Sequence, residues 1–138
     1  MVMATNGMID KLAWIQITDG KVLCARSIGK NTFYMPGGKR EPGESDQQAL
    51  VREIREELSV ELLPESMHYL GTFEAQADGK KKGILVQMTC YTAEYQGVIE
   101  PASEIEEAAW LSNADKERCS LVAKHIFDWL YRRGLLAD

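Results

Sequence analysis

The stretch from Gly38 to Val60 constrains the fold more than any other, because a glycine-rich loop leads directly into a well-marked helix. Ser45 is a favourable N-cap, and Gln48 three residues later completes a Ser-x-x-Gln capping box. Nothing breaks a helix from there to Leu58, and an apolar residue recurs at every fourth position, namely Leu50, Ile54 and Leu58. The sequence therefore predicts a loop followed by an amphipathic helix with one buried face.

A second face of this helix carries three carboxylates. Glu53, Glu56 and Glu57 are spaced at i, i+3 and i+4, so their side chains share neighbouring turns. Like charges at this spacing repel by about 0.2–0.5 kcal/mol per pair on an exposed helix. A hard divalent cation with oxygen ligands would offset the repulsion. Such charged runs are also typical of a solvated helix face, so these three residues alone leave both interpretations open.

The residues upstream of the helix favour the metal interpretation. The spacing Gly38-x5-Glu44-x7-Arg52-Glu53-Ile54-x-Glu56-Glu57-x-Ser59-Val60 resembles the Nudix box, Gly-x5-Glu-x7-Arg-Glu-aliphatic-x-Glu-Glu-x-Gly-aliphatic. The matching positions agree by chance in roughly one window in 10⁷ or 10⁸. Ser59 departs from the pattern, which has glycine there. A left-handed C-cap is expected at this position, and a residue other than glycine costs on the order of 1 kcal/mol.

The resemblance to Nudix hydrolases implies an α+β fold, an α/β/α sandwich with a mixed β-sheet between helices. It also implies one or more Mg²⁺ or Mn²⁺ ions held by Glu53, Glu56 and Glu57, with the carbonyl of Gly37 as a further ligand. In that family the general base is a box glutamate or one in a later loop, which makes Glu53 and Glu104 the candidates here. By the same resemblance Arg52 orients a box carboxylate, while Gly38 and Glu44 support the junction between loop and helix.

The choice of the later glutamate is open between three residues. An acidic loop, residues 100–107, precedes the apolar strand predicted at 108–111. Its distance from Trp110 favours Glu104, with Glu106 and Glu107 as alternatives. The other reading is that these are solvated loop acids.

Four more residues are weaker candidates for substrate contact. Arg26 ends a predicted strand and is either a solvated edge residue or a ligand of substrate phosphate. Phe33 and Tyr34 form an aromatic approach to the glycine turn, and Lys39 follows it.

The remaining pattern predicts one domain, residues 1–138, with a frayed terminus over residues 1–10. Strands are expected at 12–18, 22–27, 32–35, 60–63, 69–77, 84–93 and 108–111. A second amphipathic helix is expected from about 120 to 133, stopped by Gly134.

Composition limits the partners and the location. A net charge of −5 argues against sequence-independent nucleic-acid binding, which needs a basic surface. Three widely spaced cysteines favour buried free thiols in a reducing compartment. No stretch approaches transmembrane length, so no membrane partner is predicted, and a cytoplasmic monomer or homodimer is expected.

The resemblance leaves three possible functions open. The first is a MutT-like hydrolase that splits a (d)NTP into a nucleoside monophosphate and pyrophosphate, which suits a short chain. The second acts on ADP-ribose, a nucleotide sugar or a dinucleotide; such relatives often carry a proline or tyrosine about 15–18 residues past the box. Residues 73–78 contain neither. The third is a non-catalytic nucleotide sensor, which the complete set of box acids disfavours.

Overall fold

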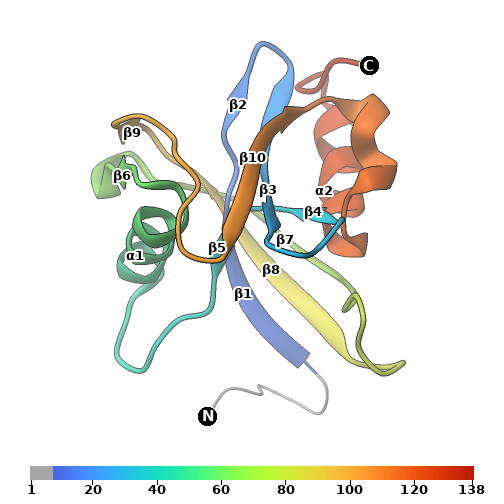
Figure 1. Ribbon diagram of the computed structural model, residues 1–138, viewed down its shortest axis with the longest axis horizontal. Helices are drawn as coiled ribbons and strands as arrows, with labels where there is room; N and C mark the ends of the chain where they lie inside the picture. The colour runs from blue at the N-terminus through green and yellow to red at the C-terminus, as the bar shows by residue number, and fades with distance from the viewer. Residues whose placement is uncertain (1–7) are drawn as a thin grey trace.

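The computed structural model describes residues 8–138, in which helices cover both faces of a β-sheet (Figure 1). This sheet has the strand order β5 (Gly37–Gly38), β1 (Met8–Trp14), β8 (Leu85–Thr92) and β7 (His68–Gln76). The β1–β8 pair is parallel, whereas β5–β1 and β7–β8 are antiparallel. The sheet is therefore mixed, as predicted.

A second sheet packs beside the first. It consists of β10 (Ile105–Leu111), β3 (Lys21–Ser27) and β2 (Ile17–Thr18), with β4 (Phe33–Tyr34) paired to β3. A small antiparallel pair, β6 (Glu61–Leu62) with β9 (Tyr95–Gln96), completes the strands.

Two α-helices and two 3₁₀ turns complete the described elements. The helices are α1 (Asp46–Leu58) and α2 (Leu121–Arg132), and the 3₁₀ turns are η1 (Pro64–Ser66) and η2 (Asn113–Arg118). At the start of α1, the Ser45 side chain accepts from the Gln48 N–H and the Gln48 side chain accepts from the Ser45 N–H. The predicted capping box is confirmed.

The alternation of side chains along β1 explains why helices lie on both faces. Leu12 and Trp14 are buried with the apolar face of α1, while Ala13 and Ile15 are buried with α2. Since successive side chains of a strand point to opposite faces, one strand supplies both cores. This arrangement confirms the α/β/α sandwich.

The first strand differs from its prediction at both ends. Residues 8–10, expected in the frayed terminus, belong to β1, because Met8, Ile9 and Asp10 pair in parallel with β8. Residues 1–7, the rest of that predicted terminus, lie outside the described residues. The predicted single strand 12–18 is also interrupted after Trp14 and restarts at Ile17 as β2, in the other sheet.

Other expectations hold. Cys24, Cys90 and Cys119 are buried free thiols, as predicted. Within residues 8–138, no helix combines the length and the hydropathy needed to cross a membrane.

Candidate active site

Two glycines of β5 bring the backbone against the carboxylates of α1. The Gly37 N–H donates to Glu57 Oε1 at 3.2 Å. Gly37 has φ +149°, and a Cβ at this position would collide with the Leu12 carbonyl. A Cβ on Gly38 would collide with the Glu53 carboxylate. Only glycine at both positions lets β5 pair with β1 while the two glutamates lie against it.

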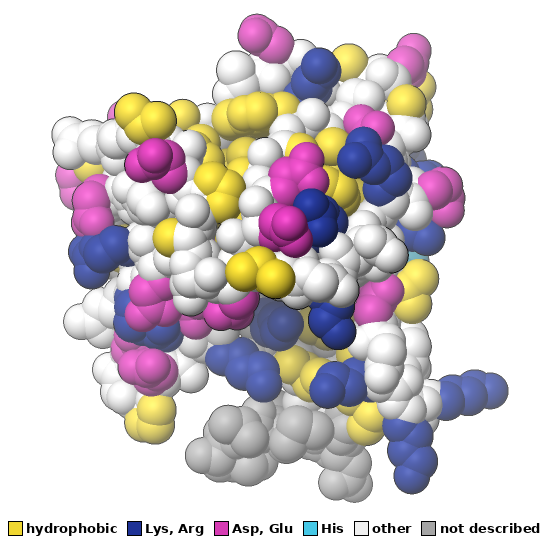
Figure 2. Space-filling model, viewed as in Figure 1, with side chains coloured by type: hydrophobic (Ala, Val, Ile, Leu, Met, Phe, Trp, Pro, Cys, Tyr) yellow, Lys and Arg dark blue, Asp and Glu magenta, His cyan; other side chains and the backbone are white. Residues whose placement is uncertain are grey.

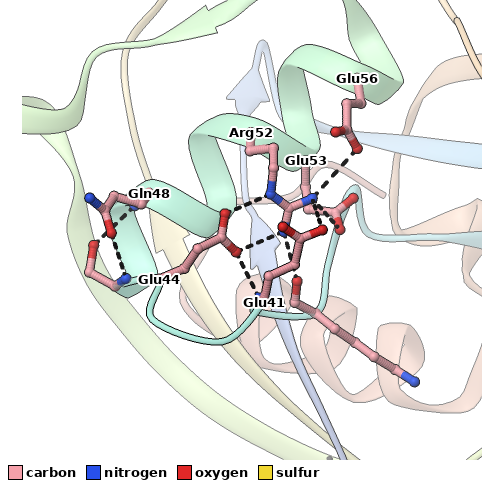
Figure 3. A network of polar contacts seen from close by, with 8 residues as sticks. Glu41, Glu44, Gln48, Arg52, Glu53 and Glu56 are labelled. Carbon is pink, nitrogen blue, oxygen red and sulfur yellow. Dashed lines mark hydrogen bonds and ion pairs between the residues drawn. The ribbon is translucent and has the colours of Figure 1, made fainter.

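Arg52 ties the loop before α1 to the helix (Figure 3). Its guanidinium donates to both carboxylate oxygens of Glu44, from Nε at 2.7 Å and from Nη2 at 2.9 Å. It also donates to Glu53 Oε2 at 3.2 Å and to the Lys39 carbonyl at 3.1 Å. The hydrogen bonds from Arg52 to Glu44, helped by the Glu41 N–H, lower the pKa of Glu44 to about 2. Arg52 therefore fixes the loop, and one of its donors holds Glu53.

Glu53 and Glu57 occupy surroundings that disfavour their negative charge. Glu57 is 7% exposed, and burial raises the pKa of its carboxyl to about 8. The Gly37 N–H opposes this shift, while the charges of Glu53 and Glu104 add to it. Burial also raises the pKa of Glu53, against the opposing effect of Arg52. These carboxylates lack a sufficient compensating positive charge.

The donor set fits a hard divalent cation such as Mg²⁺ or Mn²⁺. Carboxylate and carbonyl oxygens are its preferred ligands, and a cation would supply the charge that burial of Glu53 and Glu57 requires. Among residues 8–138, however, no three acidic, histidine or cysteine side chains are grouped closely enough to hold a metal. Mg²⁺ commonly uses one or two carboxylates together with waters and substrate phosphates. Glu56 is exposed and lies 3.6 Å from Arg52 Nη1.

The loop that carries Glu104 is attached to the C-terminal end of α1. The N–H groups of Glu100 and Ala102 donate to the carbonyls of Leu58 and Glu57, both at 2.9 Å. Ser59 Oγ donates to the Glu100 carbonyl at 2.9 Å. The loop thus satisfies helix carbonyls that would otherwise be unpaired, and it is held close to Glu57.

Ion pairs distinguish Glu104 from the other two acids of its loop. Arg26 donates to Glu107 Oε1 from Nε at 3.1 Å and from Nη2 at 3.0 Å, and lies 3.4 Å from Glu106. Glu104 forms no ion pair with any residue from 8 to 138, and its charge raises the pKa of Glu53 and of Glu57. The contacts favour Glu104 as the glutamate facing the box acids.

The structure places the four weaker substrate candidates in different surroundings. Arg26, already paired with two glutamates, also donates to the Lys30 carbonyl at 2.8 Å, so it would have to leave these partners to reach a phosphate. Phe33 is 2% exposed in the core under α2, and the structure does not bring its ring to the site.

Tyr34 is partly buried and shares a 2.6 Å hydrogen bond with Ser27. Burial raises the pKa of its hydroxyl, and the charges of Glu57 and Glu104 raise it further. Lys39 is exposed beside the Arg52 network.

One residue near these acids was missed. Burial lowers the pKa of Lys11 on β1, an effect that Lys39 strengthens and that Glu57 and Glu53 oppose. The sequence feature that could have identified Lys11 is its position directly before an apolar run. It was overlooked because Lys11 adjoins the predicted frayed terminus. Lysine and arginine side chains gather in the lower middle of the face shown in Figure 2, next to acidic ones.

Comparisons with known proteins identify the family that the chain resembles. Residues 11–130 match the NUDIX domain model. A CTP pyrophosphohydrolase of Escherichia coli K12 is 32% identical over 110 residues, which cover 76% of each protein. An NAD-capped RNA hydrolase, NudC, of Pseudomonas putida is 30% identical over 132 residues, which cover 90% of this chain and 45% of that protein. The solution structure of the E. coli ORF135 protein superposes with a TM-score of 0.71 at 27% identity, covering 91% of both chains.

Proposed function

The chain belongs to the Nudix family of hydrolases, which act on pyrophosphate bonds of nucleotide substrates, and we propose that it is a metal-dependent (d)NTP pyrophosphohydrolase. Water would attack a phosphorus atom of the triphosphate, and the products would be a nucleoside monophosphate and pyrophosphate.

The raised pKa values of Glu53 and Glu57 beside the β5 backbone carry the catalytic part of this proposal. Two carboxylates whose charge is penalised by burial form a site in which a cation binds with a large electrostatic gain. Bound there, Mg²⁺ or Mn²⁺ would neutralise the phosphate oxygens that otherwise repel an attacking water. Glu53, Glu57 and the Gly37 carbonyl are the proposed ligands, and Glu56 would join them by leaving its contact with Arg52.

The protein residues would handle the proton of the attacking water. Glu104 makes no ion pair within residues 8–138 and is held near the box acids by the backbone of its loop, so we assign it the general base. Glu53, which already accepts from Arg52, is the second candidate. Arg52 would keep Glu53 in place, and Glu44 would keep Arg52 in place.

The choice of a triphosphate is supported by the E. coli CTP pyrophosphohydrolase, because that similarity spans 76% of both proteins. The similarity to the NAD-capped RNA hydrolase spans 45% of that protein and carries less weight. No nucleic-acid partner is proposed, in keeping with the net charge of −5.

A substrate panel tests the proposal. With Mg²⁺ present, hydrolysis of the canonical and oxidised dNTPs, CTP, ADP-ribose, NAD and dinucleoside polyphosphates would be compared in the wild type and in Glu53→Gln. We expect triphosphates to be cleaved best, with kcat reduced at least about 100-fold in the variant. Glu117→Gln is the matched control, because Glu117 is 80% exposed on η2 and pairs with Lys124.

Each alternative has its own outcome. Preferred cleavage of ADP-ribose or NAD would overturn the substrate assignment and leave the roles of the acids intact. Equal activity in Glu53→Gln and the wild type would overturn the catalytic assignment.

A further inference from the structure

Lys11 lies on an apolar face of the central sheet. Along β1, Ile9 and Ala13 pack toward the core under α2, and Lys11 shares their face because strand side chains alternate. Its register partner on β8, Met88, is buried in the same core. Burying an ammonium group beside such neighbours costs free energy unless an anion compensates for it.

The same residue belongs to the electrostatic surroundings of the active site. The adjacent Leu12 pairs with Gly38, so Lys11 is one residue from the strand pair that carries Gly37 and Gly38. The charges of Glu57 and Glu53 favour its ammonium form, while Lys39 and Lys80 disfavour it. Among residues 8–138, no carboxylate lies within 4 Å of the Lys11 ammonium.

We propose that Lys11 is a substrate-binding residue that donates a charge-assisted hydrogen bond to the phosphate chain of the nucleotide. The proposal rests on the proposed function. A divalent cation bound by Glu53 and Glu57 would neutralise both acids, and a phosphate oxygen would then be the anion available to Lys11. Lysine suits this task, because its ammonium is a compact point charge that binds phosphate without a fixed geometry.

A purely structural role for Lys11 predicts a different effect of its replacement on protein stability. If Lys11 served the fold, its replacement by methionine would destabilise the protein. If it serves the substrate, Lys11→Met fills the same space with an apolar chain and removes a partly buried charge. We therefore expect this variant to unfold at an equal or higher temperature while it binds nucleotide more weakly.

The first experiment measures binding without turnover. Isothermal titration calorimetry with Mg²⁺ would compare an α,β-methylene dCTP and inorganic tripolyphosphate on the wild type, Lys11→Met and Lys11→Arg. A charge-assisted hydrogen bond contributes about 1.5–3 kcal/mol, which corresponds to a Kd about ten to a hundred times higher in Lys11→Met for both probes. Lys11→Arg should recover part of the loss.

Lys82→Met is the matched control, because it removes the same charge from an exposed position in the β7–β8 connection. Its Kd should stay within about twofold of the wild type. An equal loss in both variants would indicate a general field effect and overturn the assignment to Lys11. Unchanged tripolyphosphate binding in Lys11→Met, with weaker dCTP binding, would place the contact on the nucleoside and overturn the phosphate assignment.

A second readout separates this inference from the proposed function. If the wild type hydrolyses ADP-ribose rather than dNTPs, the proposed substrate fails, but a raised KM for ADP-ribose in Lys11→Met with a nearly unchanged kcat would still support the phosphate contact. Unchanged KM and Kd in a folded Lys11→Met would overturn it for any substrate.

Discussion

At the scale of single residues, Ser59 shows how one side chain offsets a strained backbone. It is the left-handed C-cap of α1, with φ +67°, where the Nudix pattern has glycine. Its Oγ donates to the Glu100 carbonyl in the loop that carries Glu104. The expected cost of the left-handed conformation, on the order of 1 kcal/mol, is matched by about 1 kcal/mol from this hydrogen bond.

Two substitutions of Ser59 separate these contributions. Ser59→Ala keeps the strain and loses the bond, so we expect the free energy of unfolding in urea to fall by about 1 kcal/mol. Ser59→Gly loses the bond and the strain together, so its stability should stay within about 0.5 kcal/mol of the wild type. Equal stabilities of the alanine and glycine variants would show that the left-handed backbone carries no strain here.

At the scale of elements, the connection between loop and helix depends on the fork shape of Arg52. Arg52→Lys keeps the charge but cannot donate simultaneously to both oxygens of Glu44, to Glu53 and to the Lys39 carbonyl in the same planar arrangement. We expect kcat/KM to fall about 10–100-fold in this variant, because Arg52 would orient Glu53, a proposed metal ligand, and loss of such a partner usually costs that much. The melting temperature should change little, because the network is partly exposed.

Arg55→Lys provides the control on the same helix. Arg55 also donates from two nitrogens to one carboxylate, that of Glu61, but its partner lies away from Glu53 and Glu57. Its kcat/KM should match the wild type. An equal loss in both variants would mean that helix stability, and not the orientation of Glu53, limits activity.

The elements also show what the sequence could and could not predict. The capping box and the apolar stripe of α1 could be predicted from the sequence, because both depend on residues within one or two helical turns of each other. The attachment of the 100–102 loop to the end of α1 was not, since backbone groups about 40 residues apart form it and any side chains would permit it. Lys11 and the first residues of β1 were missed because pairing with β8, and not local apolar alternation, makes them a strand.

At the scale of the whole molecule, Glu57 links stability to pH and, through the proposed metal site, to metal binding. The unfolded carboxyl has a pKa of 4.5, whereas burial raises the folded value to about 8. Between these values the unfolded chain has lost the proton that the folded protein keeps. The stabilisation is therefore complete below about pH 4.5 and is lost as the pH rises through about 8.

This linkage predicts opposite trends with and without a cation. In EDTA, the free energy of unfolding should fall from pH 5 to pH 8, by an amount on the order of a few kcal/mol. If Mg²⁺ binds the ionised carboxylate, as proposed, the increase in melting temperature that it produces should be larger at pH 8 than at pH 6. Calorimetry at both pH values, with and without Mg²⁺, measures both trends.

Glu57→Gln identifies the group responsible. The amide does not titrate, so the fall in EDTA should be much smaller, and Mg²⁺ should raise the melting temperature less at pH 8 than it does in the wild type. Burial gives Glu53 a pKa shift in the same direction, so a residual slope is expected. If the free energy of unfolding of Glu57→Gln fell with pH as steeply as that of the wild type, the pH dependence would belong to another group. If Mg²⁺ raised the melting temperature of the wild type equally at both pH values, metal binding would not depend on the ionisation of this buried carboxylate.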